Sequence, residues 1–333
     1  MATLSEPVVP VQDVEGGTPL SARAPSEIGS DTTSGERSLK GEDDPSRSVA
    51  YLDALAAPSS AKQLAWAALA EMVGTAFLVI FTTGAVVNAT ATAAGTSSLT
   101  EINLLSGLGL VLGILLAGPR SGAHLNPAIS LAVAINRPTS LPWFKLPIYW
   151  AAQLAGGLAG GGLVYGAWQV PIRTFERVQG IVRGTDASAI SAGSFTCYFP
   201  APGAISPNTN QWVNETVSHV TAFLCEAIGT AILACVVAGV LDRRVAKHID
   251  KESVIRALVI GLTLFMVETL LGPLTTGCFN PARDFGPRLV TLFAGWGRVA
   301  IPGPRTGFWI YIVAPLVGGP IGMAFYDHIL SRM

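Results

Sequence analysis

Apolar stretches separated by short polar segments make up most of the chain after residue 60. Six of these stretches are long enough to cross a bilayer, which takes roughly 20 residues, and two are shorter. The long stretches fall at about 64–87, 102–118, 143–168, 217–241, 254–272 and 307–330, and the short ones at about 127–135 and 281–294. This pattern predicts six membrane-spanning helices and two helices that cannot span alone.

Each short stretch begins at the same tripeptide. The two copies are Asn126-Pro127-Ala128 and Asn280-Pro281-Ala282. Asparagine is a good N-cap, and proline is favoured at the first helical position. We therefore expect two re-entrant half-helices that begin at Asn126 and Asn280. If they enter from opposite faces and meet end to end, they form one pseudo-span with two helix N-termini at the midplane.

A second motif precedes each tripeptide at nearly the same distance. It reads Glu-x-x-Gly-Thr and starts at Glu71 in the first half and at Glu226 in the second. A glutamate in an apolar run and an Asn-Pro at membrane depth are both costly, so their recurrence in register indicates an internal duplication. With three spans in each half, the second repeat must run upside down relative to the first. The predicted fold is an all-α membrane protein with an inverted 3+3 repeat, covering about 64–168 and 217–330.

Composition agrees with a membrane protein and divides the chain in two. Half of the 333 residues are hydrophobic, 13% are charged, and the net charge of −1 gives no reason to expect nucleic acid as a partner. Residues 1–60 are rich in Ser, Thr, Pro, Gly and acidic residues, which predicts a disordered tail before a channel domain at 61–333. Four cysteines at positions 197, 225, 235 and 278 show no metal-ligand spacing. Cys197 lies in a long loop, where a free thiol or a bridge to another chain would be accessible.

The polar segments between spans indicate the orientation in the membrane. The basic link 242–253 belongs in the cytoplasm, and Arg120 and Arg137 point the same way. Glycosylation sequons at Asn88 and Asn214 fall on the opposite side if both termini are cytoplasmic. The sequence predicts a multi-pass protein of the lipid bilayer with both termini inside, and a plasma membrane location.

Paired half-helix N-termini have a definite chemistry. Each exposes unpaired N–H groups and a partial positive charge of about half a unit, so together they repel cations and orient a passing hydroxyl. The side-chain oxygens of Asn126 and Asn280 would cap the helices and leave the amide N–H groups as donors. Upstream of each asparagine we expect extended backbone whose carbonyls form a line of acceptors, at Gly122, Ala123, His124, Leu125, Thr276, Gly277, Cys278 and Phe279.

Glutamates, a histidine and an arginine near these motifs carry the remaining candidate chemistry. Glu71 and Glu226 are expected to be structural acids that accept from loop N–H groups, with proton relay as the alternative. His124 is expected to brace the loop by donating a hydrogen bond. Arg283, directly after the second tripeptide, is expected to line the aqueous path and repel cations; bracing of loop carbonyls is the alternative.

On these motifs the chain resembles the aquaporin, or major intrinsic protein, family over residues 64–330. The positions that separate the family's two branches resemble the glycerol-conducting type here: Asp284, Arg288, Pro315 and Leu316. The long loop after the third span also fits that branch. The resemblance implies an aquaporin-like fold and a homotetramer with one pore in each subunit.

The resemblance also locates the selectivity filter, at Ser106, Glu268, Gly277 and Arg283. The bacterial glycerol facilitator has aromatics at the positions of Ser106 and Gly277, and glycine at that of Glu268. We therefore expect a wider constriction and a carboxylate that partly neutralises Arg283. Alternatively, Glu268 turns away from the pore and braces a loop.

These features together favour a passive channel for small uncharged polar solutes: water, glycerol or other polyols, urea, hydrogen peroxide or neutral metalloid hydroxides. An ion-coupled secondary transporter is the alternative, because inverted repeats and broken helices also mark that class. A water-selective channel and a closed structural membrane protein are further alternatives, although Ser106 and Gly277 argue against a closed pore. The sequence shows no enzyme constellation, no metal site and no cofactor site.

Overall fold

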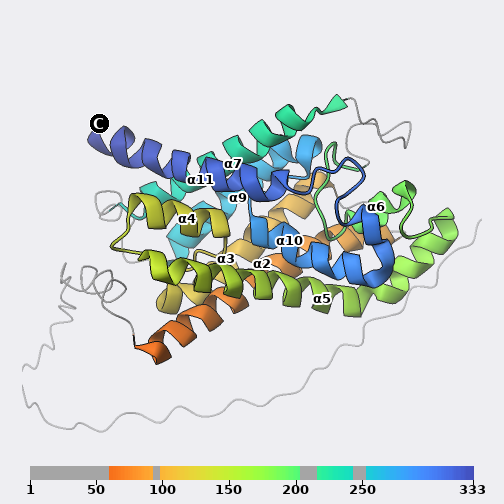
Figure 1. The fold of residues 1–333 in the computed structure, drawn as a ribbon, viewed down its shortest axis with the longest axis horizontal. Helices are drawn as coiled ribbons and strands as arrows, with labels where there is room; N and C mark the ends of the chain where they lie inside the picture. The colour runs from red at the N-terminus through yellow and green to blue at the C-terminus, as the bar shows by residue number, and fades with distance from the viewer. Residues whose placement is uncertain (1–59, 93–97, 203–215, 243–252) are drawn as a thin grey trace, which may run out of the picture. The chain divides into compact units, whose positions relative to one another are not determined.

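The structure is a computed structural model that describes residues 60–92, 98–202, 216–242 and 253–333 (Figure 1). Nearly all of the predicted tail of residues 1–60 lies outside this part of the chain. So do Asn214 and most of the basic link 242–253.

Every regular element in the described residues is helical. The long helices are α2 (Ala61–Ala91), α3 (Leu99–Ser121), α5 (Leu146–Gln179), α7 (His219–Val240), α9 (Ser253–Thr275) and α11 (Ile310–His328), and the half-helices are α4 (Pro127–Asn136) and α10 (Pro281–Thr291). Short helical pieces are α6 (Ala189–Ala192) and single turns at Trp143–Lys145, Asp186–Ser188, Leu292–Trp296, Gly297–Val299 and Leu330–Arg332. Five helices, all the long ones except α5, are long and apolar enough to cross a membrane.

Serine side chains start three of the long helices. Ser60 forms a capping box with Gln63, in which each side chain accepts from the other residue's backbone N–H. Ser98 and Ser218 cap α3 and α7 without the reciprocal bond, each accepting from the N–H three residues on. These polar residues, placed before apolar runs, fix where the helices begin.

The structure moves two of the expected boundaries. Helix α5 continues past residue 168 to Gln179 and ends at Gly180, which takes the left-handed conformation with φ 65°. The segment after the third span is therefore shorter than the long loop expected, and α6 lies within it. Helix α2 continues to Ala91, so Asn88 lies in its last turn rather than in a loop.

The two repeats exchange their half-helices. Helix α2 contacts α3 and α5 in the first repeat, and α7 makes the corresponding contacts with α9 and α11 in the second. Half-helix α4, however, packs against α11, and α10 packs against α5 (Figure 1). Each half-helix is thus seated on the last long helix of the other repeat, while α3 contacts α9 between the repeats.

Glycines allow the helices to approach closely. A Cβ on Gly107 would lie 2.5 Å from the carbonyl oxygen of Gly261, and one on Gly261 would lie 2.5 Å from that of Gly107, where α3 meets α9. A Cβ on Gly318 of α11 would overlap the carbonyl oxygen of Ala227 in α7. Small residues at helix contacts are the usual means of tight packing within a membrane, where lipid provides no hydrophobic drive for association.

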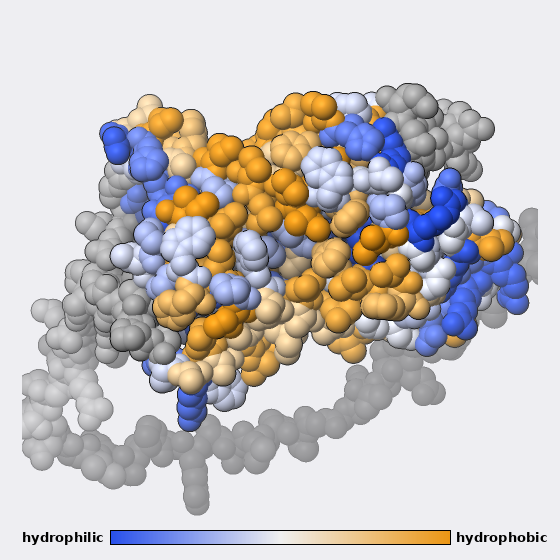
Figure 2. Space-filling view, viewed as in Figure 1, coloured by the Kyte–Doolittle hydropathy of each residue, from blue (hydrophilic) through white to orange (hydrophobic). Residues whose placement is uncertain are grey.

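Large apolar side chains remain exposed on the outer helix faces. They include Leu116 of α3, Leu224 of α7, Leu270 of α9 and Ile321 of α11. Figure 2 shows apolar side chains across the middle of one face and hydrophilic ones gathered toward its two ends. This distribution suits contact with lipid rather than water.

We expect Gly318→Ala to destabilise the fold, because its new methyl group would collide with the backbone of α7. Overpacking of this kind costs about 1–3 kcal/mol. The matched control is Gly166→Ala in α5, where nothing lies within 4 Å of the added Cβ. Thermal unfolding in detergent should give a lower midpoint for Gly318→Ala and an unchanged or higher one for the control. Equal midpoints would show that α7 and α11 have room to separate.

Candidate functional site

Both half-helices are capped by the asparagine that precedes them. Asn126 Oδ1 accepts from the backbone N–H of Ala128 at 2.8 Å. Asn280 Oδ1 accepts from the N–H groups of Ala282 at 3.0 Å and Arg283 at 3.2 Å. Both asparagines have extended backbone before a proline at the first helical position. The caps satisfy N–H groups that would otherwise lack partners at the start of each helix.

The asparagines also join the two half-helices to each other. Asn126 Nδ2 donates to the carbonyl of Phe279, and Asn280 Nδ2 donates to the carbonyl of Leu125, both at 2.8 Å. These reciprocal bonds bring the N-termini of α4 and α10 together, so the two partial positive charges face the same point. An amide nitrogen carries two hydrogens, and the loop carbonyl takes one, which leaves one N–H on each asparagine for a solute.

The backbone before each asparagine is not the extended chain expected. Ala123 and Leu125 have φ of 51° and 52°, and Thr276 and Phe279 have φ of 69° and 52°. Non-glycine residues in this left-handed region cost on the order of 1–3 kcal/mol each and persist only where their surroundings hold them. Both loops therefore need strong external support.

In the first repeat that support comes from Glu71. Its Oε1 accepts from the N–H of His124 at 2.9 Å, and its Oε2 from that of Leu125 at 2.7 Å. Gln153 Nε2 donates to Oε2 at 2.7 Å and lies 2.8 Å from Ser130 Oγ. The Nδ1 atom of His124 lies 3.1 Å from the same Ser130 Oγ, so the histidine ring braces the loop against α4.

Glu226 supports the second loop in the same way. Its two carboxylate oxygens accept from the N–H groups of Cys278 at 3.0 Å and Phe279 at 2.7 Å. Glu226 and Glu71 are both completely buried. A buried carboxylate is tolerated when donors surround it, and each of these two receives two backbone donors. Both acids therefore act as loop supports in this geometry.

A cavity of about 780 Å³ runs past both asparagines. Of the residues expected to line a pore, it is lined by Asn126, Asn280, Arg283, Glu268, Gly122, Ala123, His124, Cys278 and Phe279. Ser106, Leu125, Thr276 and Gly277 do not line it. Leu125 faces inward and is fully buried, although its carbonyl holds Asn280.

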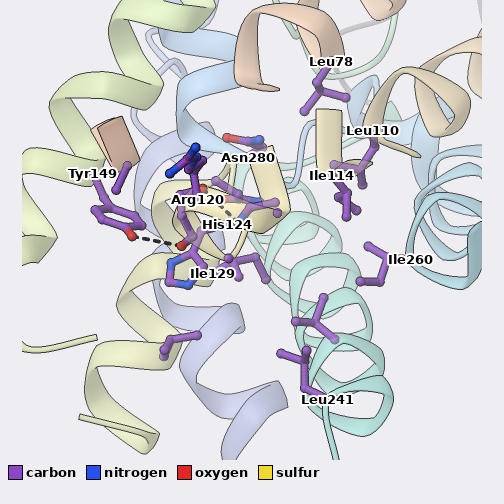
Figure 3. A pocket seen from close by; sticks show the side chains of 18 of the residues that line it. Leu78, Leu110, Ile114, Arg120, His124, Ile129, Tyr149, Leu241, Ile260 and Asn280 are labelled. Atoms are coloured by element: carbon purple, nitrogen blue, oxygen red, sulfur yellow. Dashed lines mark hydrogen bonds between the residues drawn. The ribbon is translucent and has the colours of Figure 1, made fainter. Parts of the chain in front are cut away.

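The cavity wall has an apolar and a polar side (Figure 3). On one side lie Leu78, Leu110, Ile114 and Ile260, and on the other lie Arg120, His124, Tyr149 and Asn280 together with one apolar residue, Ile129. The hydroxyl of Tyr149 donates to the carbonyl of Ser121 at 2.9 Å, which orients its ring beside that of His124. A solute with a carbon edge and a hydroxyl edge fits such a wall.

Two of the four expected filter residues, Glu268 and Arg283, line the cavity, and the other two, Ser106 and Gly277, lie beside Glu268. Glu268 Oε1 lies 2.8 Å from Ser106 Oγ, and a Cβ on Gly277 would lie 3.2 Å from Glu268 Cα. The side chain of Glu268 therefore fills the space beside the two small residues. Arg283 lines the same cavity, but no ion pair within 4.0 Å joins it to Glu268. Within the described chain, Glu268 Oε2 and Arg283 Nε are buried without a hydrogen-bond partner.

An ion pair behind the filter fixes the segment around Cys197. Arg288 and Asp284 are joined by two bonds of 2.7 and 2.9 Å and are almost fully buried. Asp284 Oδ1 accepts from the N–H of Cys197 at 2.7 Å, and Arg288 Nη2 donates to its carbonyl at 2.7 Å. Arg283 Nη1 lies 3.2 Å from Cys197 Sγ. Because Cys197 is fully buried, the bridge to another chain that its loop position allowed does not fit the structure.

The thiols of Cys197 and Cys278 and a carboxylate oxygen of Asp284 lie within 4.8 Å of one another. Both oxygens of Asp284 are already bonded to Arg288, and Arg283 adds a second positive charge beside Cys197. These charges oppose a cation at this position, so we assign no metal site there.

Comparison with known proteins decides the family. The model of the family described as "Major intrinsic protein" matches residues 59–326. The chain belongs to the major intrinsic protein family. It is 37% identical over 270 residues to the glycerol uptake facilitator protein of Pseudomonas aeruginosa, covering 79% of this chain and 88% of the relative. It is 36% identical over 261 residues to Aquaglyceroporin-2 of Rhizophagus irregularis, covering 78% and 76%.

The fold gives the same result. The aquaglyceroporin from Plasmodium falciparum superimposes with a TM-score of 0.68 at 26% identity, covering 81% of this chain and 98% of that one. The chain is therefore an all-α membrane protein with the aquaporin-like fold. Major intrinsic proteins are channels and not enzymes. The branch-type residues Pro315 and Leu316 lie in α11, buried and half-buried, and do not line the cavity.

Three supporting residues escaped the sequence analysis. Gln153 links Glu71 to Ser130, and its position as an amide inside an apolar stretch was a usable signal. Thr82 contacts Ser106 at 2.9 Å, but a threonine in a long helix gives no sign of such a partner. The contacts of Cys197 depend on tertiary structure alone.

We expect Glu226→Gln to weaken the second loop. Glutamine offers one acceptor oxygen where the carboxylate offers two, so either Cys278 N–H or Phe279 N–H loses its partner. An unsatisfied buried donor costs about 1–3 kcal/mol, which should lower the thermal midpoint in detergent. The same substitution at exposed Glu101 is the control and should leave the midpoint unchanged. Equal midpoints for the two variants would contradict a supporting role for Glu226.

Proposed function

We propose that this protein is a passive channel for water and small uncharged polar solutes, with glycerol and related polyols as its main class. The observation that carries the proposal is the pair of asparagine-capped half-helices that meet in a continuous cavity. Their two free amide N–H groups lie where a hydroxyl would pass. A solute can pass this arrangement without a chemical reaction at any of its residues.

The wall of the cavity supports a polyol rather than water alone. Leu110 and Ile260 belong to its apolar side, which suits the carbon edge of a polyol. Asn280 and the loop carbonyls of the polar side suit its hydroxyls. Urea and neutral hydroxides have the same combination of donors and acceptors and belong to the proposed solute class.

The charges of the wall oppose cations. Arg120, Arg137, Lys145, Arg256 and Arg283 line the cavity, and Glu268 is the one acid among the described lining residues. The partial positive charge of the two half-helix N-termini adds to this field. The cavity therefore favours neutral solutes and repels protons and metal cations.

The relatives favour the same class of function. Two that match most of the chain are named a glycerol uptake facilitator and an aquaglyceroporin. An ion-coupled transporter, a water-selective channel and a closed structural protein gain no support from them. The buried acids that a coupled transporter would need are engaged by backbone donors in Glu71 and Glu226.

We further infer a homotetramer in the plasma membrane, with one pore in each subunit and both termini in the cytoplasm. The exposed apolar helix faces support burial in lipid and against neighbouring copies. The basic character of the 242–253 link supports the orientation. Native mass spectrometry tests the homotetramer, and accessibility labelling of the C-terminus tests the orientation.

Purified protein in liposomes should accelerate volume changes in both water and glycerol gradients, with no gradient of protons or sodium. Stopped-flow light scattering measures both rates against empty liposomes. A passive pore gives a weak temperature dependence, because no large conformational change accompanies each solute. Flux that requires an ion gradient, or that saturates with a strong temperature dependence, would contradict the channel.

We expect Asn280→Asp to reduce glycerol permeability about tenfold, since the lost donation to the Leu125 carbonyl is worth about 1.4 kcal/mol. A carboxylate can only accept, and it also places a negative charge between two carbonyls. Asn126→Asp should behave alike because its bond to Phe279 is equivalent. Asn88→Asp, at an exposed asparagine, is the control. Wild-type permeability in well-folded variants would show that the two asparagines serve only as helix caps.

A further inference from the structure

A chain of hydrogen-bonding oxygens links Glu268 of α9 through α3 to α2. Glu268 Oε1 lies 2.8 Å from Ser106 Oγ in α3, which lies 2.9 Å from Thr82 Oγ1 in α2. Thr82 Oγ1 lies 2.8 Å from the carbonyl oxygen of Leu78. All three side chains are almost fully buried. Each of the three oxygen–oxygen distances is that of a hydrogen bond and so requires a hydrogen.

The number of available hydrogens shows whether the ionised or the neutral form of Glu268 can complete all three hydrogen bonds. The Leu78 carbonyl can only accept, and an ionised carboxylate can only accept as well. With Glu268 ionised, the hydroxyls of Ser106 and Thr82 supply two hydrogens for three contacts, and one contact has none. With Glu268 neutral, its own hydroxyl donates to Ser106, Ser106 donates to Thr82, and Thr82 donates to Leu78. Every contact then has one hydrogen.

The other two intramembrane acids provide an internal comparison. Glu71 and Glu226 each accept two backbone N–H groups, which is the environment of an ionised carboxylate. In the same described residues Glu268 receives no backbone donor, and its Oε2 has no partner. Burying a carboxylate with so few donors costs far more free energy than burying a neutral carboxyl group.

The charged and titratable groups around Glu268 are few. Glu226 of α7 and Arg283 of α10 interact with it electrostatically, with opposite effects on a negative charge. Cys278 belongs to the adjacent loop and lines the same cavity. Arg283 lines this cavity too, and its Nε is buried without a hydrogen-bond partner. An ionised Glu268 would still accept from the Ser106 hydroxyl through Oε1, while its unpartnered Oε2 would be attracted to Arg283.

We propose that Glu268 is held as a neutral acid in the conducting pore, and that its ionisation draws it to Arg283 and restricts solute flux. The proposal rests on the channel function proposed above. The residue then determines specificity in two ways. While neutral, it leaves the positive charge of Arg283 uncompensated, which excludes cations. Once ionised, it both narrows the passage and weakens that charge.

The first test is permeability as a function of pH. Stopped-flow rates for glycerol and water are measured in proteoliposomes of wild type, Glu268→Gln and Glu101→Gln, from about pH 5 to about pH 9, a range that brackets carboxyl titration in buried sites. Glutamine keeps the shape and the donor of the neutral acid. Wild type and the exposed-acid control should lose glycerol permeability several-fold as the pH rises, while Glu268→Gln should stay permeable throughout.

The second test detects the protonation state of Glu268 directly. Infrared spectroscopy of the wild type should show the carbonyl stretch of a neutral carboxyl group that disappears at alkaline pH. This band should be missing from Glu268→Gln and present in Glu101→Gln. A wild type without the band, or one whose flux does not change with pH, overturns the proposal, as does an equal pH response in Glu268→Gln. Absence of glycerol flux from all three proteins would instead overturn the channel function, since the infrared result does not depend on it.

Discussion

The pore depends on two buried carboxylates that hold otherwise unfavourable backbone in place. Glu71 and Glu226 each accept two N–H groups from a loop with left-handed residues such as Leu125 and Phe279. Leu125, Cys278 and Phe279 are buried, so their N–H groups depend on these acids, and the loop conformation and the acid require each other. In this arrangement the carbonyls of Leu125 and Phe279 accept hydrogen bonds from the two asparagine amides. Caps, loops and acids therefore form one cooperative unit in each repeat.

Much of this was readable from the sequence because it follows local chemical rules. Apolar length predicted the long helices, and Asn-Pro-Ala predicted where α4 and α10 begin, since capping depends on neighbouring residues alone. The pairing of Glu71 with its loop could be inferred from the cost of burying an acid. The backbone before each asparagine could not, because left-handed alanine, leucine and phenylalanine are chosen by tertiary contacts against their own preference.

The selectivity filter shows the same limit of prediction from the sequence. Substitution of large residues by Ser106 and Gly277 suggested open space, yet Glu268 occupies it through contacts with both. Which way a side chain turns depends on partners from other helices, here Ser106 and, beyond it, Thr82. Likewise the Asp284–Arg288 pair was evident as a family marker, but its bonds to Cys197 arise from a segment 87 residues earlier in the chain.

The exchange of half-helices has a consequence for biosynthesis. Half-helix α4 is made early, but the helix that seats it, α11, is the last long helix to leave the ribosome. Until α10 and α11 have been made, α4 and its strained loop lack the Leu125–Asn280 bond and the packing against α11. Assembly of the pore is therefore a late step that a truncation in α11 would block, even if every earlier helix had entered the membrane.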